Sequence, residues 1–365
     1  MDARAGLLLD ALGGDPGSAT LVRAPGRVNL IGDHTDYNAG WCLPVAIDRD
    51  CWVAARTGRG GRLRARSLDV AGQVDVDPWA GDLTAIEPPW GRFVAAAARE
   101  VAAPSTGGEL VVASTVPPGS GLASSAALCV ALVLALGRGD DPQEVAAAAR
   151  AAEVAATGVP VGMMDQLAAV RGRAGAALLV DCGRLEVEAV PIPAAARIGV
   201  VHSGLARTLA ASEYAARRRA CEAAARRLGL PSLRTAAPEQ VRDDPLARHV
   251  VSENQRVLAA AAALRGGDLA TLGALLVESH ASLRDDFAVS TAELDLLVEL
   301  LLDEGALGAR LTGAGFGGCV VALTGPEDDE ALLARAAGRY RRRTGLDPMP
   351  FTVVASPGAG PVPTG

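Results

Sequence analysis

The sequence of 365 residues predicts an α+β fold in two lobes, a strand-rich N-terminal lobe and a helix-rich C-terminal lobe. Half of the residues are apolar, which is enough for a large core, and the length suits two domains or one two-lobed unit. Apolar runs typical of strands dominate the first half, and long alanine-rich stretches typical of helices dominate the second. Pro191 and Pro193 separate these halves, so we expect lobes at residues 1–190 and 191–365.

Most of the strands are expected in the N-terminal lobe, where short apolar runs rich in β-branched residues occur. The expected strands are 21–24, 41–48, 51–57, 73–76, 110–116, 176–181 and 185–190. Two helices are expected among them. Residues 122–136 are continuously apolar, which predicts a buried helix, and 141–156 opens with Asp141, Pro142 and Glu144, a typical helix start.

The C-terminal lobe is expected to place long helices on a small sheet. The expected strands are 197–202, 320–324 and 351–355, and the expected helices are 209–228, 245–265, 269–282, 291–305 and 328–344. A tail rich in glycine and proline follows, and we expect it to be loosely held. The sequence contains no internal repeat.

Composition and charge exclude several classes of partner. The net charge is 35 − 42 = −7 and only 3% of the residues are aromatic, which argues against nucleic-acid binding. The longest apolar run, 126–136, is shorter than the roughly 18 residues that a membrane span needs. The six cysteines are scattered without metal-site spacing, and the N-terminus has no secretion signal, so we expect reduced thiols in the cytoplasm. We also expect a monomer.

The chain contains no lysine, since every basic side chain apart from four histidines is an arginine. Lysine Schiff bases, a lysine general base and the lysine of a P-loop are therefore excluded. Any phosphate site in this protein must be built from backbone amides, arginine and metal.

Residues 26–38, GRVNLIGDHTDYN, form the most informative segment. Its carboxylates, amides and guanidinium suit a polyhydroxylated ligand, because each sugar hydroxyl both donates and accepts hydrogen bonds. A polar surface loop is the alternative. Apolar residues interleave the polar ones and a strand follows at 41–47, which favours a site attached to the core.

A second segment, PPGSGLASSAA at 117–127, lies between an expected strand and the apolar helix. A strand, a glycine turn and a helix N-terminus together bind anions, because free N–H groups and the positive end of the helix dipole converge there. Gly119 and Gly121 let the backbone approach a phosphate, and Ser124 and Ser125 offer hydroxyls to phosphate or metal. An ordinary glycine turn with serine caps is the alternative.

Two further segments carry candidate chemistry. Asp165 in GVPVGMMDQ (158–166) has apolar neighbours and is a candidate proton acceptor, and Glu153 is a candidate Mg²⁺ ligand. Taken alone, Asp165 is equally consistent with a helix cap, and Glu153 with a solvated charge on a helix. GARLTGAGFGGC (308–319) holds five glycines, which favours close approach of main chain to a ligand over a purely structural turn.

These segments resemble, in order, the motifs of the galactokinase family within the GHMP small-molecule kinases. Residues 26–38 resemble the galactokinase signature, 117–127 the phosphate motif and 308–318 the third, glycine-rich motif of the superfamily. Further similar stretches are VGMMDQ, Asp181–Cys182, 212–224, 247–257 and 278–290. The resemblance runs from about residue 22 to about residue 351 and implies a two-lobed kinase fold with the active site between the lobes.

The resemblance also implies a substrate, cofactors and residue roles. It implies transfer of a phosphoryl group from ATP to the C1 hydroxyl of galactose, with Mg²⁺. Asp165 would be the catalytic carboxylate and Arg27 would neutralise the transferring group, while Ser125 and Glu153 match the metal ligands. The matching sugar positions are Asp33, His34, Asp36, Gly162 and Tyr214. The matching nucleotide positions are Pro117, Gly119, Ser120, Gly121, Leu122, Ala123, Ser124, Ser125 and Ala126.

Two positions depart from the family pattern. Asp33 stands where the family usually has glutamate, at the position that faces the sugar C6 hydroxyl, and Ala123 replaces a common serine. The shorter carboxylate either reaches that hydroxyl through water or makes room for another aldose, so a related kinase of N-acetylgalactosamine or arabinose is an alternative. A non-catalytic sugar sensor is a second alternative. It is disfavoured because the candidate catalytic and metal-binding residues are all present, namely Arg27, Ser125, Glu153 and Asp165.

Overall fold

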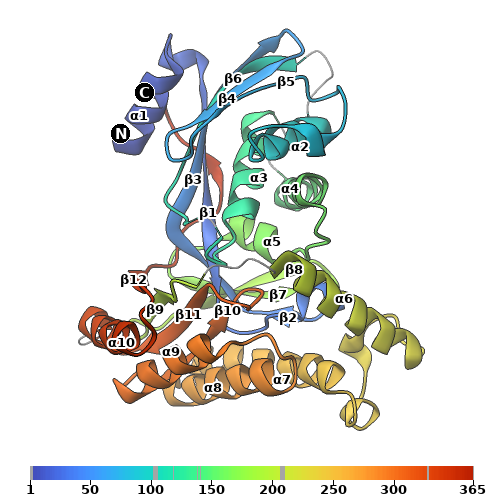
Figure 1. Cartoon of the computed structure of the whole chain (residues 1–365), viewed down its shortest axis with the longest axis vertical. Helices are drawn as coiled ribbons and strands as arrows, with labels where there is room; N and C mark the ends of the chain where they lie inside the picture. The colour runs from blue at the N-terminus through green and yellow to red at the C-terminus, as the bar shows by residue number, and fades with distance from the viewer. Residues whose placement is uncertain are drawn as a thin grey trace.

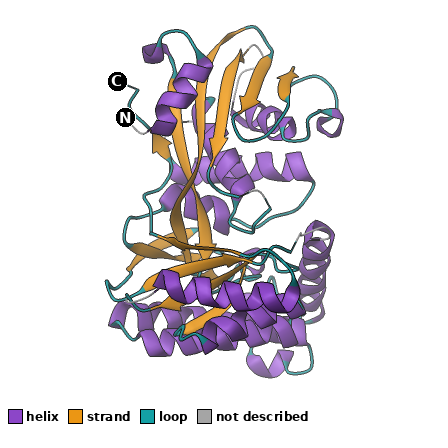
Figure 2. Cartoon of the chain, turned by 60° about the vertical axis from the view of Figure 1, so that its left-hand side comes forward, coloured by secondary structure: helices purple, strands orange, loops and turns teal. Residues whose placement is uncertain are grey.

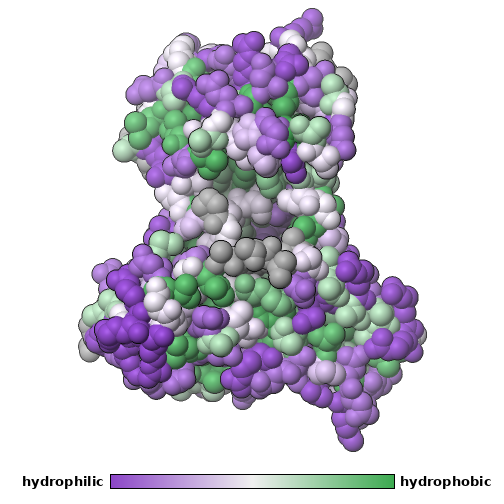
Figure 3. All heavy atoms as spheres, in the orientation of Figure 1, coloured by the Kyte–Doolittle hydropathy of each residue, from purple (hydrophilic) through white to green (hydrophobic). Residues whose placement is uncertain are grey.

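The structure is a computed structural model that describes residues 3–101, 106–117, 119–137, 139, 141–205, 210–326 and 329–364. It has two lobes, and the long strands β1 (Thr20–Asn29) and β3 (Pro44–Arg59) run from the upper lobe toward the lower one (Figure 1). The molecular surface narrows where the lobes meet (Figure 3). None of the described helices combines the length and apolarity that crossing a bilayer requires.

The first sheet has six strands in the order β13-β1-β3-β6-β4-β5. Its other members are β4 (Leu63–Ser67), β5 (Gln73–Val76), β6 (Thr106–Ser114) and β13 (Gly360–Pro361). The pair β4 and β6 is parallel and the other pairs are antiparallel. The upper lobe is therefore built on a mixed sheet whose central strands are β1, β3 and β6.

The two faces of this sheet are covered by different helices because strand side chains alternate. Val22, Val53 and Val112 face α2 (Gly91–Val101), α3 (Ser124–Ala135) and α4 (Pro142–Thr157), whereas Leu21 and Trp52 face α1 (Ala3–Leu12). Helix α3 is apolar all round, as a helix packed between a sheet and two other helices requires. This packing fixes the N-terminus of α3, where the glycine turn that contains Gly119 and Gly121 ends.

The lower lobe is a helical layer on a four-stranded antiparallel sheet of order β10-β11-β9-β12 (Figure 2). The sheet consists of β9 (Arg197–His202), β10 (Gly308–Thr312), β11 (Cys319–Thr324) and β12 (Met349–Val353). The helices are α6 (Ala210–Arg227), α7 (Pro245–Gly266), α8 (Leu269–Asp285), α9 (Ala292–Asp303) and α10 (Asp329–Thr344). A third sheet, β2-β7-β8, consists of Trp41–Cys42, Ala176–Asp181 and Glu186–Pro191.

A single apolar cluster joins the ends of β1 and β3 to the lower lobe. Val28 and Val45 pack in it together with Val200, Val257 and Val321, all of them fully buried. The polar segment that follows β1 thus begins inside a shared core, and its side chains are held by elements of both lobes.

Several expectations about secondary structure need correction. Strands 41–48 and 51–57 are not separate, because β3 continues through Asp48–Asp50, where Arg49 packs on Phe351 and Asp50 pairs with Arg23. The sequence also did not predict three helices, α1, α2 and α5 (Met164–Arg171), or strands β4 and β10. The ends at 209 and 328 of two expected helices lie outside the described residues.

The expectation of a loosely held C-terminal tail was wrong. Residues 360–361 form β13 on the edge of the first sheet, and the Val362 amide donates to the Leu21 carbonyl at 2.8 Å. The Ser356 amide donates to Ala46 and the Gly358 amide to Gly172. The tail is held because its main chain completes hydrogen bonds of the N-terminal lobe, which hydropathy does not reveal.

Candidate active site

A pocket of about 400 Å³ lies between the lobes and collects most of the predicted site residues. Those that line it are Arg27, Asp33, His34, Asp36, Gly119, Gly121, Ala123, Ser124, Ser125, Glu153, Gly162, Asp165 and Tyr214. They come from four segments that are distant in sequence: the signature at 26–38, the glycine turn before α3, the end of α4 with the start of α5, and the first turns of α6. Gly313 and Ala314 of the third glycine-rich segment also line it.

The signature segment forms a tight turn that is buried. Asp33, His34, Thr35 and Asn38 are each at most 4% exposed, so the alternative of a solvated surface loop was wrong. The Thr35 hydroxyl donates to the Gly32 carbonyl at 2.8 Å, and the side-chain amide of Asn38 donates to the His34 carbonyl at 2.9 Å. These bonds satisfy the backbone of the turn and leave its other side chains to face the pocket.

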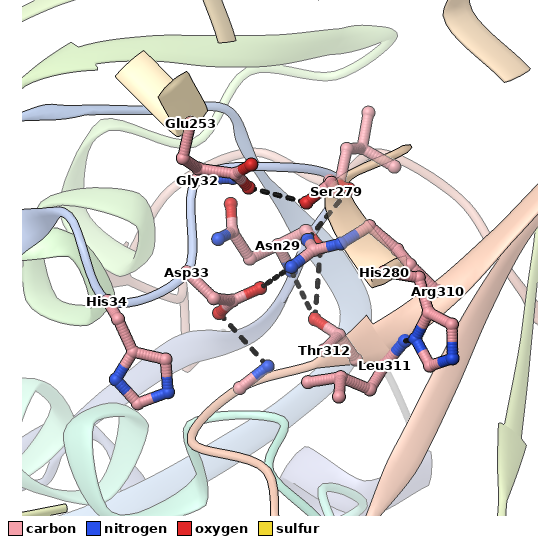
Figure 4. A network of polar contacts seen from close by, with 12 residues as sticks. Asn29, Gly32, Asp33, His34, Glu253, Ser279, His280, Arg310, Leu311 and Thr312 are labelled. Atoms are coloured by element: carbon pink, nitrogen blue, oxygen red, sulfur yellow. Dashed lines mark hydrogen bonds and ion pairs between the residues drawn. The ribbon is translucent and has the colours of Figure 1, made fainter. Parts of the chain in front are cut away.

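Asp33 is held on two sides. Its Oδ2 lies 2.6 Å from Nη2 of Arg310, and its Oδ1 accepts from the Gly313 amide at 3.1 Å (Figure 4). Burial raises the pKa of the Asp33 carboxyl, and Arg310 and Arg27 oppose that rise. Arg310 was not predicted as a site residue, although it lies in the third glycine-rich segment.

His34 forms a wall of the pocket rather than a free hydrogen-bonding group. Its Nε2 lies 3.2 Å from the Ala314 carbonyl, and its Nδ1 lies 2.9 Å from the Tyr37 hydroxyl. Burial, with His249 nearby, lowers the pKa of His34 to about 3, so the ring is neutral. Since a carbonyl only accepts, the proton lies on Nε2 and Nδ1 accepts from Tyr37. Both ring nitrogens are thus occupied.

Asp36, Gly162 and Tyr214 meet at one side of the pocket. A Cβ atom at Gly162 would overlap the Asp36 carboxylate, so only glycine fits there. Burial and the negative charge of Asp165 raise the pKa of Asp36 to about 6. The Gly162 backbone forms a hydrogen bond with the Tyr214 side chain. The ring of Tyr214 also packs against the ring of Tyr37, with 5.3 Å between the ring centroids.

Arg27, which is buried, and Asp165, which is half-buried, form an ion pair where the signature turn meets the glycine turn before α3. Nε and Nη2 of Arg27 lie 2.8 Å and 2.7 Å from the same oxygen, Oδ1 of Asp165. Arg27 Nη1 donates to the Gly121 carbonyl at 2.6 Å. Burial would lower the pKa of Arg27, but Asp165, Asp33 and Asp36 outweigh it and raise that pKa, so the guanidinium is charged. Asp165 is therefore an ion-pair partner and not a helix cap, and its Oδ2 has no partner among the described residues.

The glycine turn before α3 has the geometry of an anion site. Gly119, Gly121 and Ala123 have positive φ angles of 70°, 86° and 61°, and α3 begins at Ser124. Such a turn exposes N–H groups at a helix N-terminus. Gly313 packs directly on it, because a Cβ there would lie 2.9 Å from the Gly121 carbonyl. The third glycine-rich segment therefore borders the phosphate turn.

Four predicted nucleotide residues do not line the pocket with their side chains. Leu122 and Ala126 are fully buried in the core, Ser120 donates its hydroxyl to the Pro117 carbonyl at 2.7 Å, and Pro117 begins the turn. Their contribution is to the path of the main chain. Hydropathy alone does not separate such residues from those whose side chains face a ligand.

Ser125 and Glu153 lie together at the other side of the pocket. The Ser125 hydroxyl donates to Glu153 Oε1 at 2.5 Å, and the Gln166 amide donates to Oε2 at 2.6 Å. Glu153 is 5% exposed, so the alternative of a solvated helix charge was wrong. Burial raises the pKa of Glu153 to about 7, against both hydrogen bonds. Gln166 was not predicted as a site residue, nor were Thr157, Val159, Val161 and Met164, which also line the pocket.

The pair Ser125 and Glu153 fits Mg²⁺ but does not form a complete cage. Within the described part of the chain, no group of three or more His, Cys, Asp or Glu side chains could hold a metal. Mg²⁺ is usually bound by one or two carboxylates together with substrate phosphates. One carboxylate and one hydroxyl beside a phosphate turn have this chemistry, and the ion would be shared with a nucleotide.

Comparisons with known proteins identify the class of this fold and site. The N-terminal domain of the GHMP kinases matches residues 92–173 and their C-terminal domain matches 260–342, while the galactokinase galactose-binding signature matches 11–57. Crystallised Lactococcus lactis galactokinase in complex with galactose is 29% identical, covers 96% of this chain and 97% of its own, and superimposes with a TM-score of 0.88. The chain thus has the GHMP kinase fold.

The relatives narrow this class to one family. Galactokinase of Chloroflexus aurantiacus is 43% identical over 93% of this chain and 92% of its own length. Galactokinase of a Roseiflexus species is 44% identical over 94% and 93%. The chain belongs to the galactokinase family, which confirms the resemblance of its motifs.

Proposed function

We propose that this chain transfers the γ-phosphoryl group of ATP to the C1 hydroxyl of galactose and releases galactose 1-phosphate and ADP. The observation that carries the proposal is the Arg27–Asp165 ion pair, which lies between the carboxylates of the signature turn and the glycine turn before α3. An enzyme that transfers a phosphoryl group needs its acceptor and donor sites to meet at such a point.

Asp165 and Arg27 carry the chemistry in this proposal. Arg27 occupies only Oδ1 of Asp165, so Oδ2 accepts the hydrogen bond of the C1 hydroxyl and takes up its proton during transfer. The Arg27 guanidinium lies beside the attacking oxygen and stabilises the negative charge of the transferring group. Its bond to the Gly121 carbonyl keeps it next to the phosphate turn.

The sugar is held by side chains and the nucleotide by main chain. We assign sugar hydroxyls to Asp33 and Asp36, and contacts with the sugar ring to His34, Gly162 and Tyr214. Backbone amides of the turn, together with Ser124, hold the phosphates. When bound, Mg²⁺ neutralises phosphate charge, and Ser125 and Glu153 would hold it.

We also propose that the enzyme works as a monomer in the cytoplasm. All six cysteine side chains are buried, as expected of structural thiols in a protein folded in a reducing compartment. Light scattering on the purified protein tests the monomer, and a mass twice that of the chain would contradict it.

The substrate is tested by measuring ADP release with a panel of aldoses. Galactose is expected to give the highest kcat/KM, above N-acetylgalactosamine and arabinose, and product analysis should place the phosphate on C1. The Asp165→Asn variant serves as the inactive control. A preference for another aldose would overturn the substrate, and absence of ADP release with every sugar would favour a non-catalytic sensor.

A further inference from the structure

Arg310 is an arginine with no exposed surface at one end of the candidate active site. It lies in β10, between two fully buried apolar residues, Ala309 and Leu311. Its side chain does not line the pocket, but it contacts Asp33, which does. In Figure 4 the guanidinium points toward the Asp33 carboxylate from the β10 side.

The contacts of Arg310 are directed at the signature turn. Nη1 donates to the Leu30 carbonyl at 2.9 Å and approaches the Asn29 carbonyl at 3.3 Å, while Nη2 lies 2.6 Å from Oδ2 of Asp33. The contact with Asp33 is close but lacks good hydrogen-bond angles, so it is an ion pair held by charge. Arg310 therefore fixes both the backbone before Asp33 and its carboxylate.

A second contact fixes the other oxygen of the same carboxylate. Asp33 Oδ1 accepts from the Gly313 amide at 3.1 Å, three residues after Arg310 along the chain. Gly313 also packs on Gly121 of the phosphate turn. The Asp33 carboxylate is thus clamped between the end of β10 and the turn that follows it, and cannot rotate without breaking one of these contacts.

Stability alone is a weak explanation for this pair. Replacing buried ion pairs by well-packed apolar side chains is often neutral or stabilising, because both charges lose their hydration. Apolar residues flank Arg310 on its own strand, and an apolar side chain at this position would avoid burying a charge. What the pair provides is a carboxylate at a fixed place with a counter-charge beside it: burial raises the pKa of Asp33 overall, and Arg310 is the strongest group opposing that rise.

We propose that Arg310 is a positioning residue for the sugar, which orients the Asp33 carboxylate and supplies its counter-charge so that the remaining lone pairs of Asp33 accept a hydrogen bond from a sugar hydroxyl. This inference rests on the proposed function, since it assumes that the sugar binds beside Asp33. Arg310 does not itself touch the sugar. Its effect on binding is exerted through Asp33, and this makes a specific prediction about double variants.

The test compares Arg310→Met, Asp33→Asn and the double variant, using calorimetric galactose affinity, KM for galactose and for ATP, and the midpoint of thermal unfolding. Arg310→Met should weaken galactose binding about ten- to hundredfold, the range of a lost charge-assisted hydrogen bond, with KM for ATP within about twofold of wild type. The double variant should bind galactose as weakly as Asp33→Asn alone. It should unfold at a higher temperature than Arg310→Met, because it leaves no unpaired buried carboxylate.

A matched control is Arg23→Met, which removes the partner of Asp50 from a half-buried ion pair on the first sheet, away from the pocket. It should lower the unfolding midpoint without changing galactose affinity. If Arg310→Met does not fold, Arg310→Lys replaces it, because lysine keeps the charge but loses the second nitrogen that holds the Leu30 carbonyl. Its KM for galactose should then rise several-fold while its KM for ATP stays unchanged.

Two results would overturn the inference. One is a folded Arg310 variant whose galactose affinity stays within twofold of wild type, and the other is a double variant that binds galactose much more weakly than Asp33→Asn alone. Both require a wild-type protein that phosphorylates galactose. A wild type without that activity would overturn the proposed function instead, so the two failures are distinguishable.

Discussion

The two ends of the pocket are built from different parts of the polypeptide. At the sugar end, Asp33 and Asp36 present carboxylates that other side chains and a glycine hold in place. At the phosphate end, Gly119 and Gly121 present main chain in left-handed conformations, and no lysine exists to help. In the proposed function, selectivity for the sugar would therefore depend on side-chain identity, and phosphate binding on backbone shape.

Because of this difference, substitutions at the two ends of the pocket should affect ligand binding differently. A polar side chain at the sugar end can be exchanged for a similar one with a graded loss, because neighbouring groups still hold the ligand. A glycine at the phosphate end tolerates no side chain, since its conformation and the close approach of phosphate are both lost at once.

Asp165→Asn should have the largest effect, because Asp165 lies where the two ends meet. The amide keeps the shape of the side chain but cannot take up a proton, so kcat should fall on the order of 10²–10⁴-fold while galactose affinity changes little. Steady-state kinetics and calorimetry measure both, with the exposed Asp10→Asn as control. A kcat within a few-fold of wild type would show that Asp165 is not the catalytic carboxylate.

Gly121→Val should weaken ATP binding on the order of a hundredfold or more and leave galactose binding intact. The φ of 86° is strained for a branched residue, and its side chain would stand where phosphate approaches. Gly58→Val is the matched control, because Gly58 lies in strand β3 with open space around it. Unchanged ATP affinity in a folded Gly121→Val protein would remove the phosphate turn from the site.

The pH dependence of sugar binding separates the ends further. The pKa of Asp36 is raised to about 6, and only its ionised form accepts hydrogen bonds on both oxygens, so KM for galactose should rise about tenfold from pH 7 to pH 5. ATP affinity measured over the same range, at saturating Mg²⁺, should change less. A flat pH profile for galactose would exclude Asp36 as a hydroxyl acceptor.

The same shift has a consequence for stability, with the sign set by linkage. The pKa of Asp36 is higher in the folded state than its ordinary value of 3.8, so ionisation favours unfolding, and stability is lost as pH rises through about 6. Asp36→Asn should therefore stabilise the sugar-free protein at pH 8 by about 1–3 kcal/mol, measured by urea unfolding. The variant should gain nothing at pH 4.

Asp33→Glu should have the smallest effect on catalysis. Because Arg310 and Gly313 already hold the shorter carboxylate, an added methylene would displace it from these contacts, which should lower stability by about 1–3 kcal/mol and raise KM for galactose a few-fold. Galactose and its 6-deoxy analogue are compared in the same assay. A lower KM for galactose alone would mean instead that the longer side chain reaches the C6 hydroxyl.

The sequence predicted those parts of the fold and site whose signals are local. Strands β5, β7 and β9 were predicted with their observed bounds: β7 is a short apolar run, β9 has an apolar centre, and β5 alternates polar and apolar residues as a half-buried strand does. The signature, the glycine turn and the Asp165 segment each contain their own residue pattern, and the pocket brings these segments together.

What could not be predicted depends on partners far away in the chain. Arg310 lies between the apolar residues Ala309 and Leu311. Its role depends on its ion pair with Asp33, which stands 277 positions earlier in the sequence. The side-chain amide of Gln166 donates to Glu153 on another helix, and nothing in the sequence around Gln166 predicts this bond. Long-range pairing of this kind leaves no periodicity or spacing in the sequence.

The return of the C-terminus to the first sheet constrains the order in which this protein can be completed during synthesis. Strand β13 pairs with β1, so the two ends of the chain meet on the same lobe, beside α1 (Figure 1). All of the second lobe is translated between these two strands. The lobe that is made first is therefore finished last, and until then β1 presents an open edge to its surroundings.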